Sequence, residues 1–244
     1  MLNDDVTGAL ILIAYYLVFV LILPTLLKSR RGINTELIRK IQHVAYSLSI
    51  FLLLELFSTW YIAIAVGFML VLLAYPILII IEKTPWYNKT FVDRTVKGGE
   101  LRKQFIYVQL SFAVLIVIFW GLLGSGWHYV VAAAVMAWGF GDAAAALIGK
   151  AFGHRRVLHK LIDRGKTYEG TSAMMLFAGL AVFLTLFIYA GKPWHISFIL
   201  SIIVAPVCGI VELFSRRGTD TLTVPLSAAF LIMPLIYLFS FLGW

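Results

Sequence analysis

Charged residues are scarce in this chain of 244 residues. They make up only 13% of it, whereas 61% of the residues are hydrophobic. A soluble domain of this size needs a polar surface, and the apolar runs here are long enough to cross the hydrocarbon of a bilayer. The composition therefore excludes an ordinary soluble domain and predicts an all-α, polytopic integral membrane protein.

Features typical of secreted and metal-binding domains are also missing. The single cysteine, Cys208, lies in an apolar stretch, which excludes an intrachain disulfide and gives no sign of thiol chemistry. The opening MLNDDV is acidic where a secretory leader carries cations, so we expect the first apolar run to be a permanent helix. The five histidines do not have the spacing of a zinc motif, so a histidine metal site is not expected.

A phosphate-binding P-loop is excluded as well. The stretch Gly165-Lys166-Thr167 matches the end of a Walker A motif, but Lys160 stands where that motif needs its first glycine. The motif also follows a strand, which an all-helical protein does not supply.

Eight apolar segments are each long enough, at 1.5 Å per residue, to cross or nearly cross the membrane. They cover residues 6–27, 41–57, 60–81, 105–123, 128–148, 172–190, 196–214 and 222–242. The chain has no internal repeat and no low-complexity linker. We therefore predict a single transmembrane catalytic domain over residues 1–244.

The connecting segments alternate in charge. Residues 28–40, 82–104, 149–171 and 215–221 hold 5, 6, 6 and 2 of the 20 Lys and Arg residues, and only Lys192 lies in the other turns. Because cations resist translocation, this pattern places the basic side in the cytoplasm and both termini on the non-cytoplasmic side. The net charge of +8 then describes a cytosolic face suited to headgroups or phosphates, so nucleic acid is not an expected partner.

Asp142 is the unusual residue of the fifth apolar segment. A carboxylate in a membrane helix costs at least about 2.5–3.5 kcal/mol near the centre, so it usually faces a cavity or a partner. Asp142 lies about seven residues from the cytosolic end of its predicted helix, roughly 10 Å inward. Lys150 follows eight residues later, about two helical turns along. Gly141, Ala145 and Gly149 repeat at a spacing that allows close helix packing in lipid.

Other polar residues fall at the same side of the predicted membrane. Glu169, Glu212 and Asp220 lie at basic-side ends of apolar segments. The cations and histidine near that side are Lys150, Arg155, Arg156, Lys160, Arg164, Lys166, Arg39, Lys40 and His43. Carboxylate oxygens suit Mg²⁺ or Mn²⁺, and Lys and Arg neutralise phosphates. We interpret the combination as a site for metal and polyphosphate, with Asp142, Asp220 and Glu169 as candidate metal ligands.

The motifs in their order resemble those of the CTP-dependent prenyl-alcohol kinases, the dolichol and phytol kinases. They are "GDAAAALIGKAFG", "GKTYEGT" and "VELFSRRGTDTLTVPLSAA", with "RKIQHV" and, more weakly, "GGELRKQFIYV" before them. The resemblance runs from about residue 39 to 229, and this family shares its core with the phosphatidate cytidylyltransferases. It implies an integral membrane kinase that takes CTP from the cytosol and a polyprenol, dolichol or phytol from the bilayer.

The resemblance also implies roles for single residues. Asp142 is the essential aspartate, Lys150 and Lys166 hold nucleotide phosphates, and Glu169, Glu212 and Asp220 complete the catalytic site. The phosphate-binding candidates are Lys150, Lys166, Arg39, Lys40, His43, Arg155, Arg156 and Thr167. Thr221 stands where the family usually has Asn, so a hydroxyl group replaces an amide that offers both a donor and an acceptor. Asp220 is our choice for the general base with Asp142 holding metal, and the reverse assignment stays open.

Two other functions stay open at this point. A cytidylyltransferase that makes a CDP-lipid would use a similar acidic site, but the chain lacks the glycine-rich histidine segment typical of those enzymes. An ion-coupled transporter would use Asp142 as its ion site, but transporter sites tend to lie near the midplane between repeated halves. The membrane is expected to be a prokaryotic plasma membrane or an endoplasmic-reticulum or plastid membrane. The sequence leaves the oligomeric state open, a homodimer included.

Overall fold

The computed structural model describes residues 2–30, 32–84, 87, 100–163, 165–215 and 218–241. Within these ranges all regular secondary structure is helical, apart from one isolated antiparallel bridge between Arg156 and Thr167. Eight described helices are long and apolar enough to span a membrane, namely Asn3–Ser29, Thr35–Glu55, Trp60–Ile81, Arg102–Leu122, Ser125–Phe152, Tyr168–Tyr189, Trp194–Phe214 and Asp220–Phe241. The predicted all-α class and the eight apolar segments are confirmed.

Several helices begin earlier than the apolar pattern indicates. The second span starts at Thr35 rather than 41, because the Asn34 side chain accepts a hydrogen bond from Glu36 N at 2.9 Å and caps the helix. The sixth starts at Tyr168 rather than 172, because Thr167 caps it in the same way. Polar residues near a cap extend a helix beyond its hydrophobic run.

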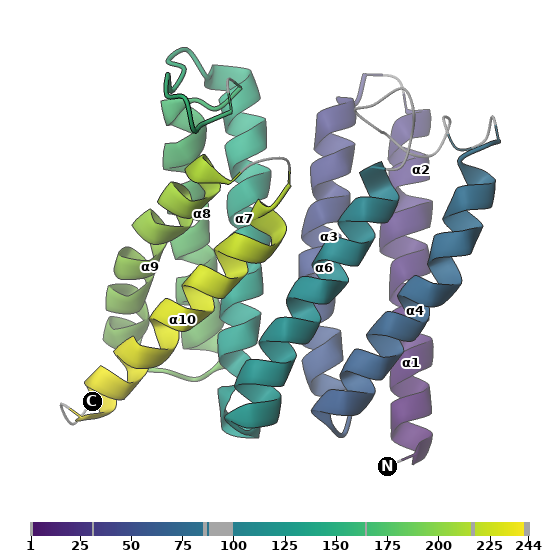
Figure 1. The fold of residues 1–244 in the computed structure, drawn as a ribbon, viewed down its shortest axis with the longest axis horizontal. Helices are drawn as coiled ribbons and strands as arrows, with labels where there is room; N and C mark the ends of the chain where they lie inside the picture. Colours follow the sequence, from purple (N-terminus) through teal and green to yellow (C-terminus); the bar gives the residue numbers. More distant parts are fainter. Residues whose placement is uncertain are drawn as a thin grey trace. The chain divides into compact units, whose positions relative to one another are not determined.

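The chain forms two compact units, Met1–Ala113 and Val114–Trp244. The first contains α1 (Leu2–Tyr16), η1 (Leu17–Ile22), α2 (Leu23–Ser29), α3 (Thr35–Glu55), α4 (Trp60–Ile81) and most of α6 (Glu100–Leu115) (Figure 1). The second contains η2 (Ile116–Leu122), η3 (Ser125–Trp127), α7 (His128–Phe152), α8 (Tyr168–Leu184), η4 (Thr185–Tyr189), α9 (Trp194–Phe214) and α10 (Asp220–Phe241). The single catalytic domain inferred from the sequence stays a prediction.

Side-chain hydrogen bonds connect the first span with α3 inside the first unit. Tyr15 Oη donates to the Ala45 carbonyl at 2.8 Å, and Tyr16 Oη lies 2.9 Å from Ser49 Oγ. Gln42 Nε2 donates to the Val20 carbonyl at 2.9 Å. Bonds of this kind satisfy polar groups that lipid cannot.

The second unit is a helical bundle built around α7. This helix packs against α8, α9 and α10, and α9 also packs against α8 and α10. Its first half is apolar on every side and buried from Val130 to Trp138, which is the pattern of a central helix. α7 therefore sets the position of Asp142 within the bundle.

Glycines bring α7 and α8 close together. A Cβ on Gly141 would lie 3.2 Å from Ala178 Cβ, and one on Gly170 would lie 3.0 Å from the Ala145 carbonyl oxygen. Gly149 faces Gly170 and Thr167. The predicted close packing through Gly141, Ala145 and Gly149 is confirmed, and it brings the chain before Tyr168 against the end of α7.

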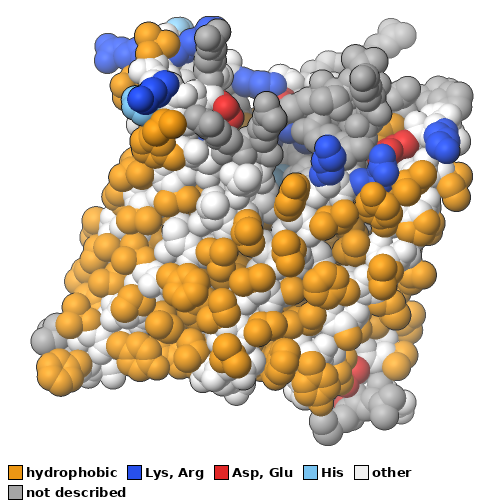
Figure 2. Space-filling view, in the orientation of Figure 1, with side chains coloured by type: hydrophobic (Ala, Val, Ile, Leu, Met, Phe, Trp, Pro, Cys, Tyr) orange, Lys and Arg blue, Asp and Glu red, His pale blue; other side chains and the backbone are white. Residues whose placement is uncertain are grey.

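Hydrophobic side chains cover the flanks of each unit in Figure 2, and on the face shown the Lys and Arg side chains of each gather at one end. This arrangement fits helices that cross a bilayer with polar ends. Which end faces the cytoplasm stays a prediction.

Candidate functional site

Four helix ends of the second unit meet at one end of its bundle (Figure 1). They are the last turns of α7 and α9 and the first turns of α8 and α10. Successive helices of this bundle run in opposite directions. The end of one helix and the start of the next therefore lie at the same end of the bundle, and every second connection returns there. The candidate residues at these ends and in the connection after α7 are Lys150, Arg155, Arg156, Lys160, Lys166, Thr167, Glu169, Glu212 and Asp220.

Lys166 and Glu212 form the central ion pair of this region. Lys166 Nζ lies 2.9 Å from Glu212 Oε1 and also donates a hydrogen bond to the Glu212 main-chain oxygen. The side chains are only 18% and 11% exposed. The contact joins the segment before α8 to the last turn of α9, 46 residues away.

The connection between α7 and α8 folds back on itself. Tyr168 N donates to the Arg155 carbonyl and Val157 N donates to the Lys166 carbonyl, both at 3.0 Å. Buried Val157 and Ile162 fix this connection against the bundle. Lys166 therefore has a defined backbone position although it lies outside a helix.

Thr167 is buried at the N-cap of α8. Its Oγ1 accepts a hydrogen bond from Gly170 N at 3.1 Å. Gly149 and Gly153 pass close to the same side chain, because a Cβ on either would lie within 3.2 Å of Thr167 Oγ1. The side chain thus has a structural role in the fold, and its phosphate-binding role stays a prediction.

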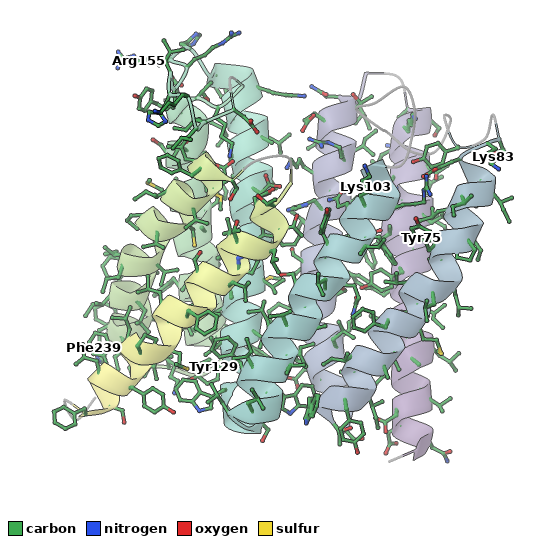
Figure 3. The ribbon with its side chains drawn as sticks, in the orientation of Figure 1. Tyr75, Lys83, Lys103, Tyr129, Arg155 and Phe239 are labelled. Atoms are coloured by element: carbon green, nitrogen blue, oxygen red, sulfur yellow. The ribbon has the colours of Figure 1, made fainter. Side chains whose placement is uncertain are left out.

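Glu169 lies in the first turn of α8 and points toward the preceding connection. Its two carboxylate oxygens accept from Arg155 N at 3.3 and 3.4 Å. The side chains of Arg155, Arg156 and Lys160 are exposed. Figure 3 places Arg155 beyond the ends of α7 and α8, at the opposite end of the second unit from Tyr129 and Phe239.

Asp142 lies deeper in the bundle than the sequence indicates. α7 continues to Phe152, so Asp142 is ten residues from the helix end, about 15 Å rather than roughly 10 Å. The helix includes Lys150 and ends at Phe152. The next residue, Gly153, is the C-cap, and its N–H donates a hydrogen bond to the Gly149 carbonyl. Asp142 is half-buried, and Asp220 is half-buried as the first residue of α10.

The structure does not gather the three predicted metal ligands. Within the residues that it describes, no three His, Cys, Asp or Glu side chains lie together as a metal site. Asp142, Asp220 and Glu169 therefore remain candidates from the sequence alone. The helix ends assemble lysine and carboxylate groups, and a divalent metal at the site stays a prediction.

The first unit holds the other three candidates on α3. Arg39 pairs with Glu36 one turn earlier, and His43 Nδ1 lies 3.2 Å from Gln104 Nε2 of α6. Lys40 and His43 are buried at 6% and 4% exposure. These residues form a polar cluster near the start of α3.

Two partners in the first unit escaped the sequence reasoning. Both lie in segments that hydropathy assigns to connections, Glu36 in 28–40 and Gln104 in 82–104, and Gln104 lies within the weakly similar stretch "GGELRKQFIYV". A second ion pair joins Arg102 of α6 to Glu82 after α4. The distances from Nε to Oε1 and from Nη2 to Oε2 are both 2.8 Å. Arg102 also lies 5.4 Å from the centre of the Tyr75 ring. This pair has no counterpart among the predicted site residues.

Comparison with known proteins gives one informative similarity. A phytol kinase from Synechocystis sp. is 33% identical to this chain over 127 residues, which is 51% of the chain and 51% of that protein. The chain thus aligns with about half the length of the relative it matches. No family model matches. No solved structure matches either. The similarity supports a prenyl-alcohol kinase family and a kinase-type enzyme.

Proposed function

We propose that this chain is a membrane-embedded kinase that transfers the γ-phosphate of CTP to the hydroxyl group of a prenyl alcohol. The observation that carries the proposal is the Lys166–Glu212 pair at the polar end of an otherwise apolar bundle. A partly buried lysine at the polar end of membrane helices suits a phosphate. The similarity to a phytol kinase supports a long-chain alcohol as the acceptor.

In this proposal the two substrates reach the site from different surroundings, because the nucleotide is polar and the alcohol is apolar. The nucleotide enters from the water at the polar helix ends, which we assign to the cytosol of a prokaryotic plasma membrane or of an endoplasmic-reticulum or plastid membrane. The alcohol remains in the bilayer and presents its hydroxyl group at the interface. The flanks of α8 to α10 expose apolar side chains such as Leu176, Ile202 and Phe230, which are compatible with a lipid tail.

Lys166 and Lys150 bind the phosphates in this proposal. Lys166 approaches from the segment before α8, and Lys150 lies exposed in the last turn of α7. Their charges offset the negative charge of the triphosphate, and phosphoryl transfer depends mainly on such positioning and neutralisation. Arg155 and Arg156 are further candidates for phosphate contacts in this unit, and the phosphate-binding roles of Arg39, Lys40 and His43 stay predictions from the sequence.

The donor set fits Mg²⁺ or Mn²⁺ in chemical type. Both ions prefer oxygen ligands, and Mg²⁺ is commonly held by one or two carboxylates with substrate phosphates completing its shell. We assign the metal to Asp142, with Glu169 as a second candidate ligand, and keep Asp220 for the proton of the hydroxyl group. A bound metal would neutralise charge on the phosphates.

The transfer forms a bond between the alcohol oxygen and the γ-phosphorus and breaks the bond from that phosphorus to the bridging oxygen. CDP leaves, and the hydroxyl proton passes to a carboxylate. Asp220 is the proposed acceptor because it lies at the helix end, where the hydroxyl group reaches water, while Asp142 lies about 15 Å inside the helix end.

Turnover by the purified chain tests this proposal. Protein in nanodiscs is supplied with phytol or a polyprenol and, in turn, CTP, ATP, GTP or UTP. We expect a prenyl phosphate with CTP, and its loss in Lys166→Ala. Lys192→Ala is the control, because Lys192 lies at the other end of the bundle, 4.9 Å from the centre of the Tyr129 ring. Absence of nucleotide-dependent prenyl phosphate from the wild type contradicts the proposal.

A further inference from the structure

Glu212 contacts Lys166 through two different oxygen atoms. One is the carboxylate Oε1 at 2.9 Å, and the other is the main-chain carbonyl oxygen of the same residue. A carbonyl oxygen in a helix cannot move away without unwinding the helix. The ammonium group is therefore fixed by one rigid acceptor and one that can rotate.

The main chain of Lys166 is fixed as well. Its carbonyl accepts from Val157 N at 3.0 Å and its N–H donates to the Asp163 carbonyl at 3.0 Å. The next residue, Thr167, is the buried N-cap of α8. An unrestrained lysine side chain loses rotamer entropy when it is ordered. Here that cost is met within the fold, before any ligand binds.

The end of α9 places this acceptor pair next to α10. Glu212 lies in the last turn of α9, where carbonyl oxygens carry partial negative charge that attracts a cation. Ser215 Oγ lies 2.8 Å from Thr223 Oγ1 in the first turn of α10. Lys166 is thus tied to the same helix end that connects to the turn bearing Asp220.

A lysine ammonium group has three N–H donors, and the two Glu212 oxygens use two of them. Resting on the proposed function, we propose that Glu212 is a positioning residue that directs the third N–H of Lys166 toward a phosphate oxygen of the nucleotide. Glu212 itself touches no substrate. Its negative charge repels phosphate, so its benefit to binding comes only through Lys166.

A double-mutant cycle tests this role in the full chain in nanodiscs. The variants are Glu212→Gln, Lys166→Met and the two combined. The Kd of inorganic tripolyphosphate is measured by calorimetry, and KM and kcat are measured with CTP and a prenyl alcohol. Because a hydrogen bond to a charged group contributes about 1.5–3 kcal/mol, we expect Glu212→Gln to raise the Kd and the KM about tenfold or more. It should have no further effect when Lys166 is already Met.

Glu82→Gln is the matched control. Glu82 caps α4 and pairs with Arg102 at 10% and 25% exposure, close to the values of the Lys166–Glu212 pair. It should lower thermal stability as Glu212→Gln does and leave the Kd of tripolyphosphate unchanged. Equal Kd values for Glu212→Gln and the wild type would show that the pair only stabilises the fold.

Three other results would overturn the inference. They are tighter tripolyphosphate binding by Glu212→Gln, an undiminished effect of Glu212→Gln in the Lys166→Met background, and no tripolyphosphate binding by the wild type. The two proposals fail separately. Coupled phosphate binding without any prenyl phosphate contradicts only the kinase, whereas turnover without coupling contradicts only the role of Glu212.

Discussion

Gly153→Ala should destabilise the end of the bundle that carries the candidate site. A Cβ at this position would overlap the Gly149 carbonyl oxygen and would lie 2.7 Å from Thr167 Cγ2 and 2.9 Å from Thr167 Oγ1. Neither neighbour can move easily, because one is helix backbone and the other is the buried cap of α8. Overpacking of this kind typically costs about 1–3 kcal/mol.

Gly165→Ala supplies the matched control. It is the same substitution in the same connection, but a Cβ on Gly165 meets nothing within 4 Å. An exposed substitution without contacts usually changes stability by less than about 0.5 kcal/mol. The two variants therefore separate the clash at Gly153 from any general effect of alanine in this connection.

The assay uses the single cysteine of the chain. Cys208 is fully buried in α9, so a thiol-reactive dye reports unfolding of the second unit on heating. At about 2–4 °C per kcal/mol, Gly153→Ala should lower the Tm by roughly 2–12 °C. Gly165→Ala should leave it nearly unchanged. An unchanged Tm in Gly153→Ala, or equal losses in both variants, would refute the packing described for α7 and α8.

Three further predictions concern the site and its orientation. Asp142→Ala and Asp220→Ala should each reduce turnover at least about a hundredfold while the Cys-reactive assay still shows a folded protein, and near-normal turnover of either would exclude its proposed role. Lys150→Ala should raise the KM for CTP, whereas an effect no larger than that of Lys192→Ala would restrict Lys150 to a role in topology. In Lys192→Cys the new thiol should react with an impermeant maleimide in intact cells, whereas in Lys160→Cys it should react only after permeabilisation. The reverse pattern would invert the proposed orientation.

The positions of the helices follow from the sequence more closely than their ends do. Long apolar runs leave few alternatives in a bilayer, so eight spans are readable directly. The ends depend on capping and burial of polar side chains. Thr35–Lys40 and Tyr168–Gly170 read as connecting segments by hydropathy but are helical in the structure, because Asn34 and Thr167 cap them.

The sequence also predicts the location of the site better than the contacts within it. Alternating helix direction is enough to expect Lys166, Glu169, Glu212 and Asp220 at one end. The partner of each residue is not readable, because the Lys166–Glu212 pair depends on how the connection after α7 folds back. The depth of Asp142 was also misjudged, since the α7 end is set by Gly153 rather than by the last apolar residue.

The fate of the CTP phosphates tests the proposed kinase activity most directly. The wild-type protein is incubated with a prenyl alcohol and CTP labelled at either the γ- or the α-phosphate, and the lipid product is extracted. The proposal predicts the γ-label in the lipid, no α-label, and release of CDP. An α-label in the lipid together with cytidine, and release of pyrophosphate, would contradict the kinase and show cytidylyl transfer.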